Sequence, residues 1–276
     1  MTAATPHPLS ELLRRYSYGY TAAHDFDVAR QIMVEDYRLL MGEHVVRGRE
    51  EQYIPATARQ YRQFPTLGFT VHDLLVAPDR AALHFSEHGY STLHSCYCTW
   101  SGISTYRWDG ARLVECRVEQ DYFARREQQR TTRPNALPAP AIDPWNTAGE
   151  AAESGVEDAV RSWLTNGGLA DSPRGSLDDE HCVDPTRMRL DDPTVEVLDL
   201  FGAGRRAAFH VRSTGTYAGG LPGLDEHLGR AATLYGCGIA TVSGDGAVRA
   251  HAITDRLAAE RRLVDPTSEA EGSGPA

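Results

Sequence analysis

Apolar residues follow two different spacings in the first half of the chain. Helical spacing predicts helices over Leu9–Ala23, with Ser10 as a candidate cap, over Asp27–Val34, and over Arg49–Gln63, which contains Pro55. Strand-like patterns predict β-strands at Tyr37–Val46, Phe69–Val76, Arg80–Tyr90, His94–Trp108 and Arg112–Phe123. Helices followed by an antiparallel meander indicate the α+β class.

The second half repeats the strand pattern with a weaker helical part. Strands are predicted at Val195–Gly202, Arg206–Tyr217, Thr233–Val242 and Val248–Leu257. Before them, only Val156–Leu164 has a convincing helical pattern, because Pro and Gly discourage a helix in Pro138–Ser154.

The two halves are also related residue by residue. Shifted by 126 positions, Phe69–Gly89 aligns without a gap on Val195–Gly215, with nine of 21 residues identical. Unrelated segments would share roughly one or two. The identities include Asp73/Asp199, Arg80/Arg206 and His84/His210. A repeat of this size indicates tandem domains rather than solenoid units.

These patterns divide the chain into four parts. We expect a first domain at 1–130, a linker at 131–150, a second domain with a degenerate helical part at 151–264, and a disordered tail at 265–276.

The net charge and the cysteine content limit the kinds of binding partner and the compartment that we expect. A net charge of −10 disfavours nucleic acid and anionic membranes as partners, since both need a basic face. No signal peptide or membrane-spanning apolar run is evident, and the five scattered cysteines suggest free thiols in a reducing compartment. The expected location is therefore the cytoplasm.

Three stretches of the first half carry a family resemblance: HDFDVARQIMVEDYRLL, VRGREE and GISTYRWDGARLVECRVEQDYF. They resemble the nuclear-transport-factor-like superfamily, and within it the SnoaL-like polyketide cyclases, with ketosteroid isomerases and limonene epoxide hydrolases as relatives. The resemblance implies tandem cone-shaped domains, each with N-terminal helices packed on a curved antiparallel sheet, and no cofactor. Because members pair through the convex face of the sheet, it also implies a pseudo-dimer within the chain and allows a homodimer.

The resemblance points to catalytic residues near the end of the last strand of the first domain. Family members carry a catalytic aspartate there, and Asp121 matches it best, with Glu119 on the same face of the strand. His84 is a second candidate acid or base. Each has a structural alternative: Asp121 as a helix cap or salt-bridge partner of Arg125 or Arg126, and His84 as a donor in a structural hydrogen bond.

Further residues suit binding rather than proton transfer. Tyr20, Tyr37, His88 and Trp100 are candidates to line an apolar substrate pocket. In the second domain, the candidates are instead His210 and Asp255, which stand at the positions of His84 and Asp121. His94, Cys96 and Cys98 alternate along one strand, but no distant second pair completes a zinc site, so no metal is expected.

The expected function is that of a cofactor-independent SnoaL-like enzyme. It would cyclise, isomerise or dehydrate an apolar, oxygenated small molecule by general acid/base catalysis, in secondary-metabolite biosynthesis. One alternative is a non-catalytic protein that binds a hydrophobic ligand or acts as a scaffold. Another is an epoxide-opening enzyme, which needs a second acid across the cavity from the first.

Overall fold

The computed structural model describes residues 5–171, 175–179 and 187–265. Its first half begins with α1 (Pro8–Arg14), which continues as a π-helix over Arg15–Ala22, and with α2 (Phe26–Ile32). A π-helical turn at Arg49–Tyr53 then leads into α3 (Ile54–Gln63). Pro55 is accommodated because it lies in the first turn of α3, where its missing N–H leaves no hydrogen bond unmade.

Six strands form the first sheet: β1 (Met33–Met41), β2 (His44–Arg47), β3 (Gly68–Val76), β4 (Arg80–Ser91), β5 (Cys96–Trp108) and β6 (Leu113–Gln120). Their order is β2-β1-β6-β5-β4-β3. The segment predicted as one strand at Tyr37–Val46 is the end of β1, a turn, and most of β2. β1 runs parallel to β6, so the sheet is mixed rather than wholly antiparallel.

The second half has the same plan with fewer helices. α5 (Val156–Thr165) and the short α6 (Gly168–Asp171) precede β7 (Gly175–Leu177), β8 (Leu190–Ala203), β9 (Arg206–Tyr217), β10 (Ala231–Val242) and β11 (Val248–Thr254). The sheet order is β7-β11-β10-β9-β8, and β7 is parallel to β11 as β1 is to β6. Tandem α+β domains, as expected from the repeat, are therefore observed.

A helix follows the last strand in each half, and the predicted strands Arg112–Phe123 and Val248–Leu257 extend by two residues into these helices. α4 (Tyr122–Thr131) starts after Asp121, and α7 (Arg256–Val264) starts after Asp255. The two helices contact each other, and Arg126 of α4 forms an ion pair with Glu260 of α7 at 2.6 Å.

Both halves have a register shift at the same place in their sheets. The pairing of β3 with β4 shifts register between Val71 and Asp73, and the pairing of β8 with β9 shifts between Val197 and Asp199. These positions correspond under the 126-residue shift. A bulge is a specific local feature, so its recurrence at one place supports the duplication independently of sequence identity.

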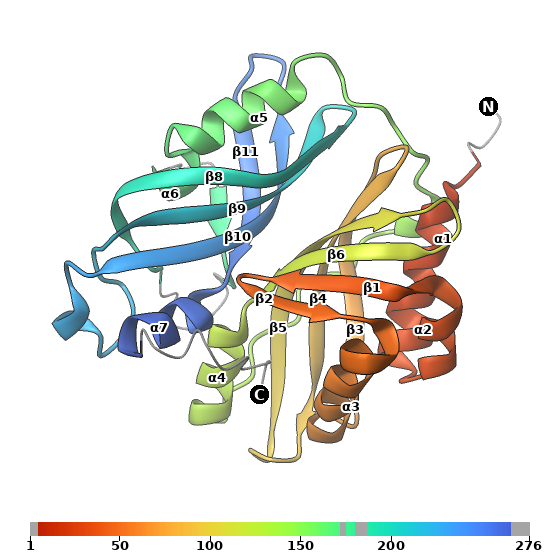
Figure 1. The fold of residues 1–276 in the computed structure, drawn as a ribbon, viewed down its shortest axis with the longest axis horizontal. Helices are drawn as coiled ribbons and strands as arrows, with labels where there is room; N and C mark the ends of the chain where they lie inside the picture. The colour runs from red at the N-terminus through yellow and green to blue at the C-terminus, as the bar shows by residue number, and fades with distance from the viewer. Residues whose placement is uncertain (1–4, 172–174, 180–186, 266–276) are drawn as a thin grey trace.

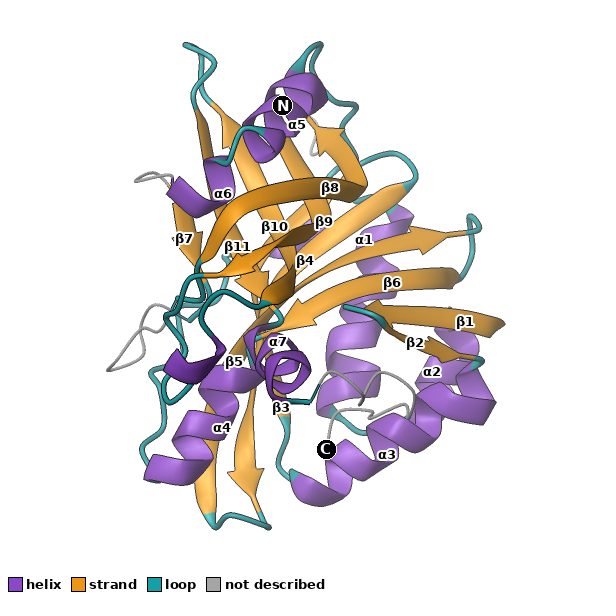
Figure 2. Ribbon diagram, turned by 60° about the vertical axis from the view of Figure 1, so that its left-hand side comes forward, coloured by secondary structure: helices purple, strands orange, loops and turns teal. Residues whose placement is uncertain are grey.

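Each sheet has two faces with different neighbours. The cone face of the first sheet, which includes Leu83 and Phe85, packs with α1, α2 and their surroundings into one core. The opposite face, here called the pairing face, lies against the second half, where Ala82 and Ile103 share a cluster with Phe201, Ile239 and other residues. Figures 1 and 2 show the two sheets side by side, with α1–α3 beyond one and α5 beyond the other.

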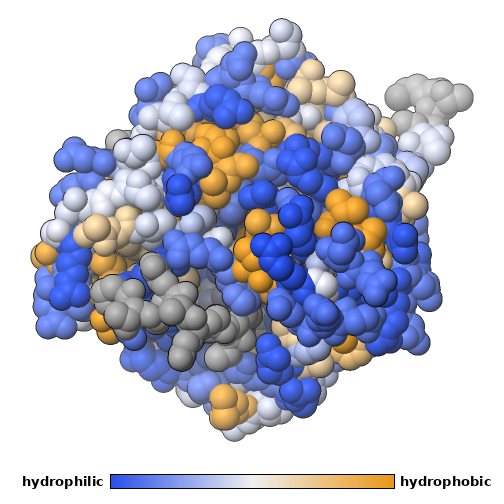
Figure 3. Space-filling model, viewed as in Figure 1, coloured by the Kyte–Doolittle hydropathy of each residue, from blue (hydrophilic) through white to orange (hydrophobic). Residues whose placement is uncertain are grey.

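The segment predicted as a linker is hydrogen-bonded to β3 of the first half. Ala141 N donates to Val71 O at 2.8 Å, and Glu150 N donates to Val76 O at 3.0 Å. Apart from Asp265, the predicted disordered tail lies outside the described residues, as does Cys182. In the described part of the chain, no helix is both long and apolar enough to span a membrane. Hydrophobic residues on the face drawn in Figure 3 form separate patches among hydrophilic ones.

Candidate functional site

A cavity of about 550 Å³ lies in the first half, between its helices and the cone face of its sheet. This volume is in the range of small-molecule sites. Its walls come from the π-helix after α1, the hairpin β1–β2, α3 and the ends of β4, β6 and α4. Aromatic and polar side chains predominate among the lining residues, which include Tyr16, Tyr20, Tyr53, Gln60, Glu87, Gln120, Tyr122 and Arg125.

Glu87 is the only carboxylate among the described residues that line this cavity. It continues the cone face of β4 after Leu83 and Phe85, and only 6% of it is exposed. Gln60 of α3 donates to its Oε2 at 2.6 Å. Burial raises the pKa of Glu87 from 4.5 to about 7, although the Gln60 hydrogen bond and the charge of Arg125 act in the opposite direction. Such a carboxyl can both accept and release a proton near neutrality.

Arg125 brings a positive charge to the same cavity. Its guanidinium is buried among three aromatic rings, 4.3 Å from the centroid of Tyr122, 5.2 Å from Trp100 and 5.7 Å from Phe64. Burial lowers the pKa of Arg125, while Tyr122 and Glu87 raise it. A guanidinium remains charged under such shifts, and it can stabilise negative charge that develops on a bound molecule.

Tyrosine hydroxyls supply hydrogen-bonding groups around the same space. Tyr16 and Tyr53 share a hydrogen bond of 3.2 Å between their hydroxyls, and Tyr20 donates to Thr57 Oγ1 at 2.8 Å. Burial raises the pKa of Tyr16 and of Tyr20. These groups therefore stay neutral, and the hydroxyl that accepts in the Tyr16–Tyr53 pair can donate its own proton to an oxygen atom of a bound molecule.

Asp121 lies elsewhere, on the pairing side of the first half. Fully buried, its carboxylate caps α4 by accepting from Ala124 N at 3.0 Å, and it also accepts from Asp179 N at 2.9 Å. It forms an ion pair with Arg256 of α7. These contacts are those of a cap and salt bridge, although the cation is Arg256 rather than Arg125 or Arg126.

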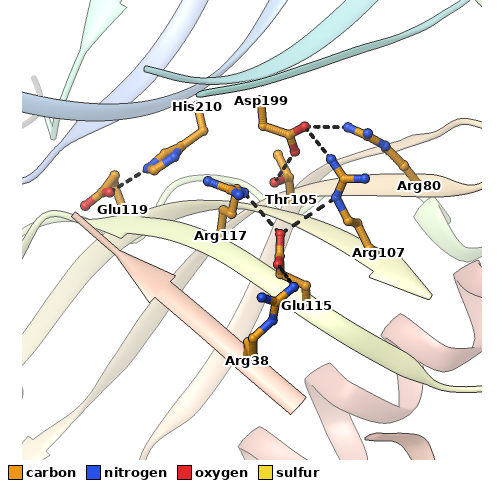
Figure 4. Close-up of polar contacts among 9 residues, drawn as sticks. All are labelled: Arg38, Arg80, Thr105, Arg107, Glu115, Arg117, Glu119, Asp199 and His210. Atoms are coloured by element: carbon orange, nitrogen blue, oxygen red, sulfur yellow. Dashed lines mark hydrogen bonds and ion pairs between the residues drawn. The ribbon is translucent and has the colours of Figure 1, made fainter. Parts of the chain in front are cut away.

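Glu119 shares a face with Asp121, as the strand period predicted, but this is the pairing face. Its Oε1 accepts from Gly42 N at 2.8 Å and bonds His210 Nε2 of the second half at 2.8 Å. His210 and Glu119 are almost wholly buried, so they form a link across the interface (Figure 4). Neither residue lines the cavity.

His84 also lies on the pairing face, where its ring is 4.5 Å from that of His251 and 5.0 Å from that of His72. His88, on the same face of β4, shares a 3.0 Å hydrogen bond with Thr70 Oγ1. Both face away from Glu87, because alternate residues of a strand point to opposite sides.

The predicted aromatic residues differ in whether they reach the cavity. Tyr20 lines the cavity, whereas Tyr37 and Trp100 are buried in the core around it. The ring of Tyr37 packs edge to face on that of Tyr53, with centroids 5.0 Å apart. Trp100 donates through its indole N–H to Oε1 of Gln120 at 2.8 Å, and so orients a side chain that does line the cavity.

Asp255 is the counterpart of Asp121 in the second half. It accepts from Tyr235 N at 2.7 Å and forms an ion pair with Arg262 at 2.7 Å. Burial raises the pKa of Asp255, and Arg262 opposes that rise. Its contacts, like those of Asp121, fix the junction between the last strand and the following helix.

Additional charged residues join the halves in the network drawn in Figure 4. Asp199 of the second half accepts from Arg107 at 3.0 Å and from Thr105 Oγ1 at 3.4 Å, and it also pairs with Arg80. Arg206 of the second half pairs in return with Asp73 of the first. The recurring aspartate of each half thus pairs with the recurring arginine of the other half, as expected for a pseudo-twofold interface.

The strand pattern of the sequence indicated Glu87, whereas the family resemblance indicated residues near the end of the last strand. Ala81, Leu83 and Phe85 form the apolar face of β4, and Glu87 is the next residue on that face. An ionisable group that continues a core-facing row is more telling than one on the polar face.

An α+β domain with a cavity enclosed by helices and one sheet face is a common scaffold for small-molecule binding. Residues 13–116 match the family model of the SnoaL-like domain. The first half therefore contains a SnoaL-like domain, which confirms the resemblance seen in the sequence. The matched segment includes Glu87 and ends before Glu119.

The similar solved structures align with about half of this chain or less. A candidate SnoaL-like polyketide cyclase from Jannaschia sp. CCS1 is 21% identical over 41% of this chain and 85% of that one, with a TM-score of 0.39. IdmH, a candidate polyketide cyclase from Streptomyces antibioticus, is 18% identical over 44% of this chain and 98% of its own, with a TM-score of 0.40. At these TM-scores the likenesses carry no argument of their own. No curated protein matches the chain.

Proposed function

We propose that the first half is a cofactor-independent acid/base enzyme with Glu87 as the proton-transferring group. The observation that carries this proposal is a buried carboxyl, with its pKa raised to about 7, facing a cavity of about 550 Å³. The carboxylate form of Glu87 would remove a proton from a carbon next to a carbonyl group. The protonated form would return it at another carbon or oxygen, which yields isomerisation, cyclisation or dehydration.

The surroundings of Glu87 suit such a reaction. Negative charge that moves onto the carbonyl oxygen after proton removal needs stabilisation, and Arg125 and the tyrosine hydroxyls are placed around the same cavity to supply it. The aromatic walls favour an apolar molecule with a few oxygen atoms, in keeping with the polyketide or terpenoid intermediates expected from the family. Asp121 and Glu119 have structural contacts instead, so they take no part in the proposed reaction.

Paired-acid epoxide opening gains no support, because the described lining residues include no second carboxylate opposite Glu87. A protein that only binds an apolar ligand remains the competing class. Such a protein could bind its ligand in the same cavity, but binding alone does not require the raised pKa of Glu87.

Exchange of carbon-bound hydrogen tests the proposal without knowledge of the natural substrate. A panel of aromatic ketones, such as 2-tetralone, is incubated in D₂O, and loss of the α-proton signals is followed by NMR. The wild-type protein should accelerate exchange, and Glu87→Gln should abolish the acceleration. Asp121→Asn, if folded, should retain it.

Two results would contradict the proposal: no acceleration with any ketone that binds, or equal acceleration by Glu87→Gln. Ketone binding without exchange would favour the binding protein. Thermal unfolding of each variant shows whether a loss of exchange reflects loss of the fold.

A further inference from the structure

A second cavity, of about 490 Å³, lies between the two halves. Asp73, His84 and Ile103 of the first half line one side. Residues of the second half line the other, among them Arg206, Ile239 and His251. It is separate from the cavity of Glu87, because its residues lie on the pairing face of the sheet.

The cavity lies where the pseudo-twofold symmetry of the interface is broken. Across the first sheet, His84 pairs in register with Ile103, and Ile103 with Glu119. Across the second, His210 pairs with Cys237, and Cys237 with Ile253. Isoleucine therefore stands in the second half where the first has Glu119. His210 receives a carboxylate from the other half, but the corresponding position for His84 offers an apolar side chain.

His84 consequently has a polar atom that the structure leaves unused. Among the described residues, its buried Nε2 has no hydrogen-bond partner. A buried polar atom without a partner destabilises the structure, so a ligand that accepted a hydrogen bond from it would remove that cost. Burial lowers the pKa of His84, and the neighbouring His251 and His72 lower it further. A negative charge beside the ring would counter all three effects.

The other lining groups favour an anion with an apolar part. Arg206 and Arg249 add two guanidinium groups, of which Arg206 is already paired with Asp73. Ser176 contributes a hydroxyl that is hydrogen-bonded to His251 Nδ1, and Ile103 and Ile239 provide apolar walls. In the described part of the chain, no three histidine, cysteine or acidic side chains are grouped to hold a metal ion.

We infer that this cavity binds a small carboxylic acid in its carboxylate form. Its carboxylate accepts a hydrogen bond from the ring of His84, as the Glu119 carboxylate does from His210, and its alkyl part lies along Ile103 and Ile239. A carboxylate is favoured over other anions because the interface already contains this arrangement, with an oxygen of Glu119 2.8 Å from Nε2 of His210.

Calorimetric titration of the full chain with acetate, butyrate and hexanoate at pH 6.5 tests the inference, with inorganic phosphate as a second arm. Affinity should increase by about fourfold for each added methylene that is buried in the cavity. His84→Phe should weaken hexanoate binding at least tenfold. Glu87→Gln, in the other cavity, and Arg212→Gln, at an exposed ion pair with Glu196, should bind hexanoate like the wild type.

A spectroscopic readout does not depend on a variant that folds. In the wild-type protein, saturating hexanoate should raise the pKa of His84, followed by NMR through its ring C–H signals. Three results would overturn the inference: hexanoate binding that His84→Phe leaves intact, binding that Glu87→Gln removes, or a His84 titration that hexanoate leaves unchanged. Binding of phosphate but of no carboxylate would overturn it as well.

Discussion

The two halves agree on one face of the sheet and differ on the other. On the pairing face, Asp73, Arg80 and His84 of the first half recur as Asp199, Arg206 and His210 of the second. On the cone face, Glu87 of the first half corresponds to Ser213 of the second. The first cone is also covered by α1–α3, whereas α5 is the main helix over the second.

The difference shows what recurrence within a duplicated chain means. Each half must fit the other, so the residues that meet across the interface are restrained in both copies. A ligand site carries no such restraint, because one active cone is enough. Recurrence of His84 therefore marked contact between the halves, and the non-recurring Glu87 marked the candidate site.

The largest effect is expected when the first cone is given the residue of the second. Glu87→Ser removes the proton-transferring group and should reduce ketone α-proton exchange by about 10²–10⁴-fold, the usual contribution of a general base. The NMR exchange assay measures it. A variant that retains more than a tenth of the wild-type rate would place the chemistry elsewhere.

Removal of a buried link across the pairing face should cost the most stability. Glu119→Ala leaves His210 and Gly42 N without their shared acceptor, and should lower the free energy of unfolding by about 3–5 kcal/mol in urea titrations. Glu196→Ala is the matched control, because its pair with Arg212 is exposed and is worth less than about 1 kcal/mol. Equal losses in the two variants would mean that the interface does not depend on this pair.

The stability of the first cone should depend on pH through Glu87. In the folded protein Glu87 keeps its proton up to about pH 7, whereas the unfolded chain releases it near 4.5. The folded state binds the extra proton between these values, so the contribution of Glu87 falls as pH rises from 4.5 to 7 and stays low above that.

Glu87→Gln removes this dependence. At pH 8 the variant should be more stable than the wild type by roughly 3 kcal/mol at most, and near pH 4 the two should be alike. Urea unfolding at a series of pH values checks the trend. Parallel curves for the two proteins would show that Glu87 has an ordinary pKa.

The smallest expected effect is the difference in stability contribution between the two reciprocal ion pairs. The side chain of Asp199 is 5% exposed and has several partners, whereas that of Asp73 is 35% exposed and pairs with Arg206. Asp199→Ala should cost about 2 kcal/mol more in free energy of unfolding than Asp73→Ala, since solvent screens the more exposed pair. Identical costs would indicate that the two ends of the interface are equivalent.

Strand alternation and the internal repeat predicted most of the fold. The meander strands of both halves begin and end within a few residues of the prediction, since each has an apolar face to bury. α4 and α7 were missed because both are short and follow the strands directly, so the strand pattern continued into their first residues. The parallel neighbours β1 and β7 depend on long-range pairing, which local patterns do not encode.

The candidate site was harder to predict. The sequence places Glu119 and Asp121 on one strand face, but it does not reveal that the second half covers this face. Tyr20, a predicted substrate-binding residue, does line the first cavity. Gln60 and Arg125 reach the cavity from helices that are distant from Glu87 in sequence, so their proximity follows only from packing.

The reciprocal pairing of Asp73 with Arg206 and of Asp199 with Arg80 has a consequence for assembly. Subunits that meet through a shared face normally separate on dilution. Here one polypeptide carries both partners, so their association is a first-order process with a fixed effective concentration. The first cone thus keeps its neighbour at any protein concentration, and the second half stays paired with it although it has fewer helices.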